Sequence, residues 1–394
     1  MAESRKKILY VHHGKGIGGA PISLLQMACG LDKKKYDPVV LFLHNSDAVD
    51  LFKDRGVKVL GPVGRYDFSH TKIWWYRWYH IHHILRALWD SFFLWFWDAK
   101  NWIKKVKPDI IHLNTSTLLV WGVVAKKMRI PVVWHVREPL SKGYFGFRRW
   151  LVKKVVGKYS DIILPICKND ALPWKDLSKT KVLYNAVDLK KFDSKMRKKT
   201  ETPTILFLGG LSKEKGTHII LRVFEKLLLK LPEAILKVAG YWGVEEKCNF
   251  FLSSPSEKFK ETLEKLVLPV KKSVEFLGPI KNVPEEMSQS TCLVFPATVG
   301  HFARPVIEAG CMGVPVVASN LPPLDELVID GKTGFLVTPD DIESWVEKLA
   351  KICMSERLRL KMGLEAKIFC CGKFGLEKQV KMLEEIYENL IQSA

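Results

Sequence analysis

Short apolar runs alternate with segments of helical periodicity along most of the chain. In the first half, the runs that we predict to be buried strands are 8–13, 39–43, 57–60, 110–113, 132–135, 162–166 and 182–183. In the second half they are 205–208, 234–239, 274–277, 292–295, 314–318 and 334–337. Short strands that alternate with helices favour parallel sheets covered on both faces. The pattern therefore predicts an α/β protein with two Rossmann-like, doubly wound domains.

The alternation stops once, in a polar and basic segment without apolar periodicity at 188–203, which we predict to be a linker. An N-terminal domain would then span 1–187, with an aromatic and basic insertion near 69–107, and a C-terminal domain would span 204–375. The remaining residues, 376–394, predict an amphipathic helix. Its apolar positions at helical spacing are Val380, Leu383, Ile386, Tyr387 and Leu390.

The passage 300–319 carries the strongest chemical signal. It predicts a loop, a helix that starts near Pro305, a glycine stop and a buried strand. The N-terminus of a helix presents backbone N–H groups that can hold a phosphate. Glu308 follows in the same helix, and a carboxylate can accept two hydrogen bonds from neighbouring sugar hydroxyls. Phosphate and ribose together indicate a site for a nucleotide-sugar.

A glycine-rich loop follows the first strand of each predicted domain. The loop in the first domain contains Gly18 and Gly19, and glycine tolerates close approach and positive φ. The loop in the second domain contains Lys215, whose ammonium can stabilise a leaving diphosphate. A dinucleotide fingerprint would need a glycine where Pro21 stands and an acidic residue after the second strand. We therefore do not expect NAD binding.

Four segments together resemble the GT-B-fold glycosyltransferases of the retaining group 1, also called family 4. They are FLGGLSKEKG, VEFLGPI, LYNAVDLKKF and the 300–319 passage, which resembles a Glu-x7-Glu motif. The resemblance implies two Rossmann-like domains facing across a cleft, with the C-terminal helix packing back toward the N-domain. It also implies transfer of a sugar from a UDP- or GDP-sugar with retention of configuration. Such enzymes typically need no metal and no cofactor, because the nucleotide-sugar is itself a substrate.

The resemblance also assigns roles to individual residues. Lys215 and Arg304 would face the diphosphate, and Glu308 would bind the ribose. The donor-binding set that it implies is Gly18, Gly19, Lys215, Phe302, Ala303, Arg304, Pro305, Val306 and Glu308. Family members often carry a His-Asp pair after the strand at 132–135, and in register Arg137 takes the position of that His and Glu138 that of the Asp. His135 and Arg137 are therefore both candidate catalytic residues.

Two positions depart from the family pattern. Gly210 stands where an arginine is common, and Gly300 replaces the first glutamate of the motif. Lys213 is a candidate to supply the missing cation, and the amides of residues 302–304 could hold sugar hydroxyls. The departures leave an alternative open, in which the chain is a non-catalytic relic that binds a nucleotide-sugar or a glycan.

The net charge of +20 favours acidic partners, but no recognised RNA or DNA motif accompanies it, so we do not expect nucleic-acid binding. Residues 74–97 hold eleven aromatic side chains, and the lysines of 100–107 follow directly. Charged residues interrupt the aromatic block, which argues against a spanning helix. Together with the basic, apolar segment 142–158, the block predicts contact with an anionic membrane surface. The alternatives are helices that only cover the sheet or bind a partner subunit.

The eight cysteines show no paired spacing that would indicate zinc, and several lie in apolar runs. Such thiols favour a reducing compartment, and no charged-then-apolar signal segment precedes the first strand. We therefore expect a cytoplasmic protein that can attach to the inner face of the membrane. Its acceptor would be a lipid-linked or cell-envelope glycan, or another polysaccharide.

Overall fold

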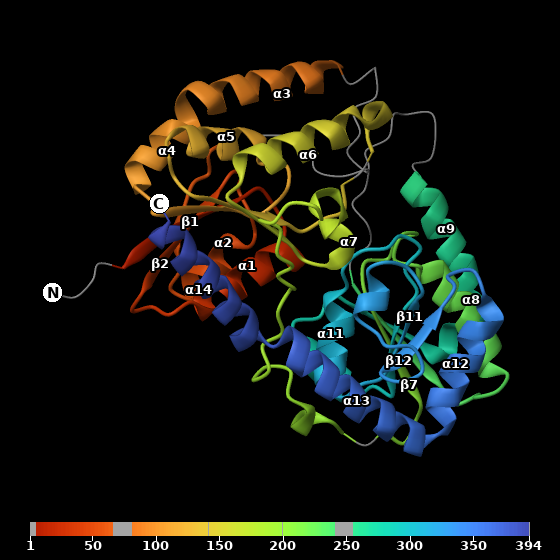
Figure 1. Cartoon of the computed structure of the whole chain (residues 1–394). Helices are drawn as coiled ribbons and strands as arrows, with labels where there is room; N and C mark the ends of the chain where they lie inside the picture. Colours follow the sequence, from red (N-terminus) through yellow and green to blue (C-terminus); the bar gives the residue numbers. More distant parts are fainter. Residues whose placement is uncertain (1–4, 66–80, 141, 199, 241–254, 394) are drawn as a thin grey trace. The chain divides into compact units, whose positions relative to one another are not determined.

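The computed structural model describes residues 5–65, 81–140, 142–198, 200–240 and 255–393. The chain forms two compact units, which are described separately (Figure 1). Unit 1 comprises Met1–Ala186 together with Leu376–Ala394, and unit 2 comprises Val187–Gly375. The segment 188–203, predicted to be a linker, falls within unit 2 and contains one short 3-10 turn, Ser194–Met196.

Unit 1 is built on a six-stranded parallel sheet with the strand order β3-β2-β1-β4-β5-β6. Its strands are β1 Lys6–His12, β2 Tyr36–Phe42, β3 Lys58–Leu60, β4 Ile110–Leu113, β5 Val132–Val136 and β6 Ile162–Pro165. Its helices are α1 Gly19–Gly30, α2 Val49–Asp54, α3 Ile81–Phe93, a π-helical turn Leu94–Asp98, α4 Ala99–Val106, α5 Leu119–Lys127, α6 Phe147–Tyr159, α7 Lys168–Ala171 and α14 Leu376–Gln392. The described part of unit 1 also contains the 3-10 turns Tyr144–Gly146 and Leu172–Trp174.

Alternate residues of each strand in unit 1 enter different cores, because successive side chains of a strand point to opposite faces. Leu9 and Val11 of β1 join a core with α4, α5 and α6. Ile8 and Tyr10 join a core with α1, α2 and α14. Figure 1 shows these two groups of helices on opposite faces of the sheet. The apolar stripe predicted for the last helix is thus buried against unit 1.

Unit 2 repeats the architecture with the strand order β12-β11-β10-β7-β8-β9, again entirely parallel. Its strands are β7 Thr204–Leu208, β8 Ile235–Ala239, β9 Val274–Gly278, β10 Cys292–Phe295, β11 Val316–Ser319 and β12 Gly334–Val337. Its helices are α8 Thr217–Leu228, α9 Pro255–Val267, α10 Val283–Ser288, α11 Arg304–Cys311, α12 Ile342–Met354 and α13 Glu356–Phe374, with 3-10 turns at Leu268–Ser273 and Leu324–Glu326. The predicted α/β class with two Rossmann-like domains is confirmed.

One predicted strand is wrong. Residues 182–183 lie outside every strand, although the Leu183 amide donates a 2.9 Å hydrogen bond to the Pro165 carbonyl. The neighbouring Thr180 forms a single bridge with Ile163 of β6. A short segment beyond the edge strand can follow it for a few bonds without forming a ladder, and Leu183 is fully buried all the same. Apolar character alone could not distinguish the two cases.

Both strand orders reverse at one point, between β1 and β4 in unit 1 and between β7 and β10 in unit 2. In open parallel sheets, ligands bind beside the carboxyl ends of the strands at such a switch point. The loops after β1, β4 and β5 in unit 1, and after β7 and β10 in unit 2, are therefore the places to look for chemistry.

A buried hydrogen-bonded chain joins α14 to the sheet of unit 1. The Tyr387 hydroxyl lies 2.9 Å from the Tyr10 hydroxyl and 2.6 Å from Nδ1 of His112. We expect Tyr387→Phe to lower the free energy of unfolding by about 1–3 kcal/mol, because it leaves buried polar groups unsatisfied. Tyr36→Phe is the control, since its hydroxyl makes one longer bond of 3.3 Å to the Glu384 carbonyl. Urea unfolding of both variants measures the difference, and equal losses would contradict the role of Tyr387.

Candidate functional site

Two loops meet at the switch point of unit 2. Gly216, at φ 76°, ends the loop after β7, and a Cβ added there would lie 1.7 Å from the Pro296 carbonyl oxygen. Thr298, in the loop after β10, donates a 2.9 Å backbone hydrogen bond to the Glu214 carbonyl, and its hydroxyl donates to the Lys213 carbonyl at 3.0 Å. Glycine is required at 216 because the loops touch, and this contact brings Lys215 next to the 300–304 segment.

The half-buried ammonium of Lys215 is bonded to a histidine. Its Nζ lies 2.5 Å from Nε2 of His301, and Nδ1 of His301 lies 2.8 Å from the Val299 carbonyl oxygen. Burial lowers the pKa of Lys215 to about 8 and that of His301 to about 4. Within the described part of the chain, no carboxylate lies at ion-pair distance from Lys215. Lys215 is thus a cation that an incoming anion would neutralise.

Helix α11 begins next to this pair. Nη2 of Arg304 donates a 2.9 Å hydrogen bond to Oε1 of Glu308, one turn later, and both side chains are buried. Ala303 caps the helix without any side-chain hydrogen bond, so the first-turn amides have no side-chain cap. The side chain of Val306 is buried in the interior, which leaves that residue a packing role. Half-buried Phe302 contacts the ring of Phe374 edge-on.

The two departures from the family pattern have different structural contexts. A Cβ at Gly300 would lie 1.9 Å from the Pro322 carbonyl oxygen, so no larger residue fits without a shift of the main chain. The close packing of this loop therefore leaves no room for a glutamate at position 300. Lys213, the candidate to replace the cation missing at Gly210, is exposed. Lys215 and Arg304 are cations that lie at the switch point.

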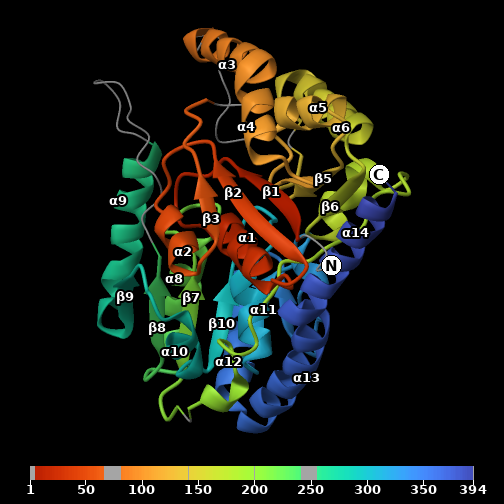
Figure 2. The same cartoon turned by 90° about the vertical axis from the view of Figure 1, so that its left-hand side faces the viewer.

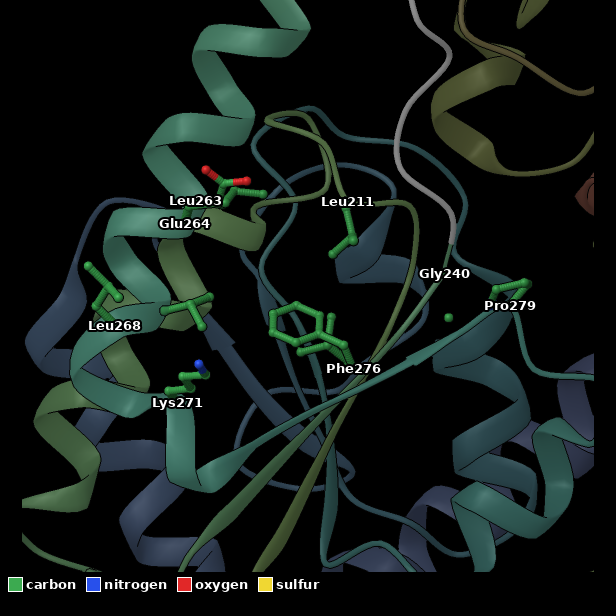
Figure 3. Close-up of a pocket in the computed structure, with 11 residues that line it drawn as sticks. Leu211, Gly240, Leu263, Glu264, Leu268, Lys271, Phe276 and Pro279 are labelled. Atoms are coloured by element: carbon green, nitrogen blue, oxygen red, sulfur yellow. The ribbon is translucent and has the colours of Figure 1, made fainter.

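A cavity of about 530 Å³ opens beside the Lys215 loop (Figure 3). Leu211 faces it from that loop, and Phe276 faces it from β9. Gly240 at the end of β8 also lines it, and a Cβ there would lie 1.6 Å from the Gly209 carbonyl oxygen. The remaining lining residues are Val238, Leu263, Glu264, Val267, Leu268, Lys271, Gly278 and Pro279. The cavity is mostly apolar and large enough for a planar ring.

At the switch point of unit 1, the guanidinium of Arg137 is held by hydrogen bonds to two asparagine side chains. Its Nε donates to Oδ1 of Asn114 at 2.6 Å, and its Nη1 donates to Oδ1 of Asn185 at 2.7 Å. Nδ2 of Asn114 lies 2.9 Å from Nδ1 of His12, which connects the ends of β1 and β4. These bonds fix the direction of the guanidinium at the edge of the sheet.

His135 lies behind Arg137 rather than beside it. It is fully buried, and its Nδ1 is 3.0 Å from Nε2 of His112 and 3.4 Å from Nη2 of Arg137. Burial, followed by the charge of Arg137, lowers the pKa of His135 well below its usual range. His135 is therefore neutral and supports Arg137, and this burial favours Arg137 over His135 for direct contact with a substrate.

The carboxylate of Glu138 binds the loop after β4. Its Oε1 accepts hydrogen bonds from the Thr115 hydroxyl at 2.6 Å, the Ser116 hydroxyl at 2.5 Å and the Ser116 amide at 3.0 Å. It thereby ties the loop after β4 to the loop after β5. A carboxylate engaged in this way organises the switch-point loops of unit 1.

Gly18 and Gly19 do not adopt the positive φ expected of them. Gly18 caps α1 in an extended conformation at φ −118°, and Gly19 is the first residue of the helix. A Cβ at Gly18 would meet nothing within 4 Å, so protein packing does not require glycine there. The second expectation, close approach of a ligand to the backbone, stays a prediction that this open space permits.

Sequence reasoning missed His301, His112, Asn114, Asn185 and Tyr387. Asn114 had a signal, because it is the first polar residue after a buried strand. His301 also had one, since it lies inside the motif between Gly300 and Arg304. The other three could not be found from spacing, because the fold alone brings them to Arg137 and His135.

Comparison with known proteins covers both units. A model described as glycosyl transferases group 1 matches residues 188–369, and one described as glycosyltransferase family 4 matches residues 17–191. The sulfoquinovosyl transferase SQD2 of Arabidopsis thaliana is 26% identical over 67% of this chain but only 54% of its own length. The capsular polysaccharide glycosyltransferase CapM of Staphylococcus aureus is 23% identical over 76% of this chain and 83% of its own.

The fold is shared with solved structures. The structure of Anabaena HepE in complex with UDP superimposes with a TM-score of 0.78 at 18% identity, over 97% of this chain and 100% of that one. The same Anabaena protein has also been solved with UDP-glucose. The two family models together span residues 17–369, and the chain belongs to the GT-B-fold glycosyltransferases of group 1, family 4.

Proposed function

We propose that this glycosyltransferase moves a sugar, with retention, from a UDP- or GDP-sugar to a lipid-linked or cell-envelope glycan. The observation that carries the proposal is the switch point of unit 2. There, a half-buried lysine without a carboxylate partner in the described chain adjoins a helix N-terminus and a buried Arg304–Glu308 pair. The arrangement combines groups that suit a diphosphate with a carboxylate that suits a ribose.

The leaving diphosphate gains negative charge as the bond to the sugar breaks. Lys215, Arg304 and the first amides of α11 can compensate this charge without reorganising, because they are already in place. The proposed reaction therefore uses no metal ion. The apolar cavity beside Leu211 and Phe276 would hold the base, and Glu308, oriented by Arg304, would accept bonds from the ribose hydroxyls.

Retention follows from attack on the face that the leaving group occupies. The bond between the anomeric carbon and the diphosphate oxygen breaks, and the acceptor oxygen bonds to that carbon on the same side. The acceptor proton passes to the departing diphosphate oxygen. No protein carboxylate is needed as a nucleophile, which fits a chain with glycine at 300. Arg137, held by Asn114 and Asn185, would donate hydrogen bonds to hydroxyl oxygens of the sugar or the acceptor.

The alternative, a relic that binds its ligand without turnover, rests on Gly300 and Gly210. A relic that binds a nucleotide-sugar predicts the same donor binding without product, and a relic that binds a glycan predicts no donor binding. Relatives named for sulfoquinovosyl transfer and for capsular polysaccharide biosynthesis favour an active transferase, and the second of these names favours an envelope glycan as acceptor.

A donor panel tests the proposal. UDP-, GDP-, ADP- and dTDP-sugars are added without metal, and thermal unfolding is followed. One donor at 100 times its Kd should stabilise the protein by about 2.7 kcal/mol. Glu308→Ala and Glu308→Gln should lose most of the shift, whereas Glu343→Ala, which removes an exposed acid of unit 2, should keep it. A shift from none of the donors would contradict the proposal, and binding without product from any acceptor would establish the relic.

The affinity for UDP should depend on pH through Lys215. The ammonium is charged below its pKa of about 8, and a bound diphosphate raises that pKa further. Affinity should therefore be full near pH 7 and fall by up to about tenfold per pH unit as the pH rises above 8. Lys215→Arg should flatten the profile, because arginine stays charged. Titration calorimetry measures this, with Lys213→Ala as the control; a wild-type profile without a decline would contradict the role of Lys215.

An exposed apolar face in unit 1 supports a membrane partner. Asp90 of α3 is only 5% exposed and points to Arg65, whereas Leu88 and Trp89 are 64% and 63% exposed. The helix therefore turns the Asp90 carboxylate inward and exposes Leu88 and Trp89, together with Arg86. Figures 1 and 2 show α3 as the outermost helix of this end of unit 1. The exposed set, here called the aromatic face, is Leu85, Leu88, Trp89, Phe92, Phe96 and Trp97.

Basic side chains accompany the aromatic face. Lys104 and Lys105 lie in the last turn of α4, and α6 carries Lys153, Lys154 and Lys158 beside exposed Phe147 and Trp150. Aromatic and basic residues together suit the headgroup region of an anionic bilayer. The residues 66–80, which include five of the predicted aromatics, lie outside the described chain. In the part that is described, no helix has both the length and the apolar character needed to cross a bilayer.

Vesicle flotation tests the membrane contact. The protein should float with phosphatidylglycerol vesicles, float less at high salt, and stay behind with phosphatidylcholine. Leu88→Ser with Trp89→Ser should reduce flotation severalfold, because the apolar contact area is lost. Leu360→Ser with Ile368→Ser, equally exposed apolar residues of unit 2, is the matched control. Equal flotation of all variants would refute the proposal, and a wild-type dimer lost only in the first variant would assign the face to a second copy.

A further inference from the structure

Lys215 is held by two aromatic rings rather than by an acid. Its Nζ is 2.5 Å from Nε2 of His301 and 5.9 Å from the centroid of the Phe295 ring. The rings of Phe295 and His301 lie 5.4 Å apart. Phe295 is the last residue of β10, and Lys215 and His301 lie in the loops after β7 and β10, so the cluster stands at the switch point of unit 2.

The hydrogen positions in this cluster follow from the partners. A carbonyl oxygen only accepts, so Nδ1 of His301, 2.8 Å from the Val299 carbonyl, carries the ring hydrogen. Nε2 then has a lone pair and accepts from the ammonium of Lys215. An ammonium has three N–H donors, and this bond uses one of them. Two donors remain for oxygens of a ligand.

A neutral acceptor leaves the charge of the lysine intact. Arg304 is paired with Glu308, whereas Lys215 faces an imidazole that contributes no negative charge. A carboxylate in the position of His301 would form an ion pair and cancel the charge that a diphosphate needs. Gly300 cannot supply a side chain, because Pro322 blocks its Cβ position. The next residue, His301, is therefore the one that reaches Lys215 from this loop.

We propose that His301 is a positioning residue, which holds the Lys215 ammonium as an uncompensated cation aimed at the diphosphate of a nucleoside diphosphate. The inference rests on the proposed function and deepens it, because it assigns a role to a side chain of the loop in which the family glutamate is missing. It predicts that the neutrality of residue 301 matters as much as its hydrogen bond.

Three substitutions at one position separate these two properties. His301→Gln keeps a neutral acceptor, His301→Leu removes the acceptor, and His301→Glu adds a countercharge. For UDP binding to the full chain by calorimetry at neutral pH, we expect a near-normal Kd for the Gln variant. The Leu variant should bind roughly tenfold more weakly, and the Glu variant more weakly still. His218→Leu, which removes another half-buried histidine of unit 2, is the control for nonspecific effects.

A second readout does not depend on any ligand. The ammonium of a hydrogen-bonded lysine exchanges slowly with water, so Lys215 should give a resolved 15N signal, assigned by its loss in Lys215→Arg. The signal should persist in His301→Gln and vanish in a folded His301→Leu protein, whose melting temperature shows that it is intact. A persistent signal in the Leu variant, or UDP binding equal to wild type in the Leu or Glu variant, would overturn the inference. Absence of both UDP and GDP binding by the wild type, with the signal behaving as expected, would instead refute the proposed donor site.

Discussion

The parallel pairing of strands is the constraint on which this protein depends. Because every strand of a parallel sheet ends at the same edge, each unit gathers its strand-end loops in one place. The reversal of strand order between β1 and β4, and again between β7 and β10, separates the connections on either side. Polar residues at these two points can then meet without disturbing the apolar layers beneath them.

The two switch points treat buried polar groups differently. In unit 1, Arg137 is surrounded by neutral amides and by a fully buried His135–His112–Tyr387 chain, so its direction is fixed by many bonds. In unit 2, the ammonium of Lys215 bonds to His301 and has no carboxylate at ion-pair distance among the described residues, so it can still bind an anion. The fixed guanidinium of Arg137 suits hydrogen bonds to hydroxyl groups of a substrate. The ammonium of Lys215 suits a diphosphate that binds with the donor and dissociates after the reaction.

At the surface of unit 1, ion pairs also fix the orientation of the aromatic face. A helix covering a sheet normally turns its apolar side inward, but Arg65 draws Asp90 and Asp98 toward the body of unit 1. The Arg65 guanidinium also lies 4.5 Å from the centroid of the Phe93 ring. These inward polar contacts leave Leu85, Leu88 and Trp89 of α3 exposed, where only an apolar partner would remove them from water.

The periodicity of apolar residues determined the α/β class, the two sheets and most of the strands, because burial on both faces leaves a strong local pattern. The pattern failed at 182–183, where Leu183 is buried outside a ladder. The glycine-rich loop of the second domain pointed to Lys215, and the 300–319 passage pointed to Arg304 and Glu308, since strand, loop and helix follow one another directly in the chain. The pairing of Lys215 with His301, and the chain from Tyr387 to Arg137, were decided only by tertiary structure. Those contacts join residues far apart in sequence, and no local periodicity encodes which loops the strand order brings together.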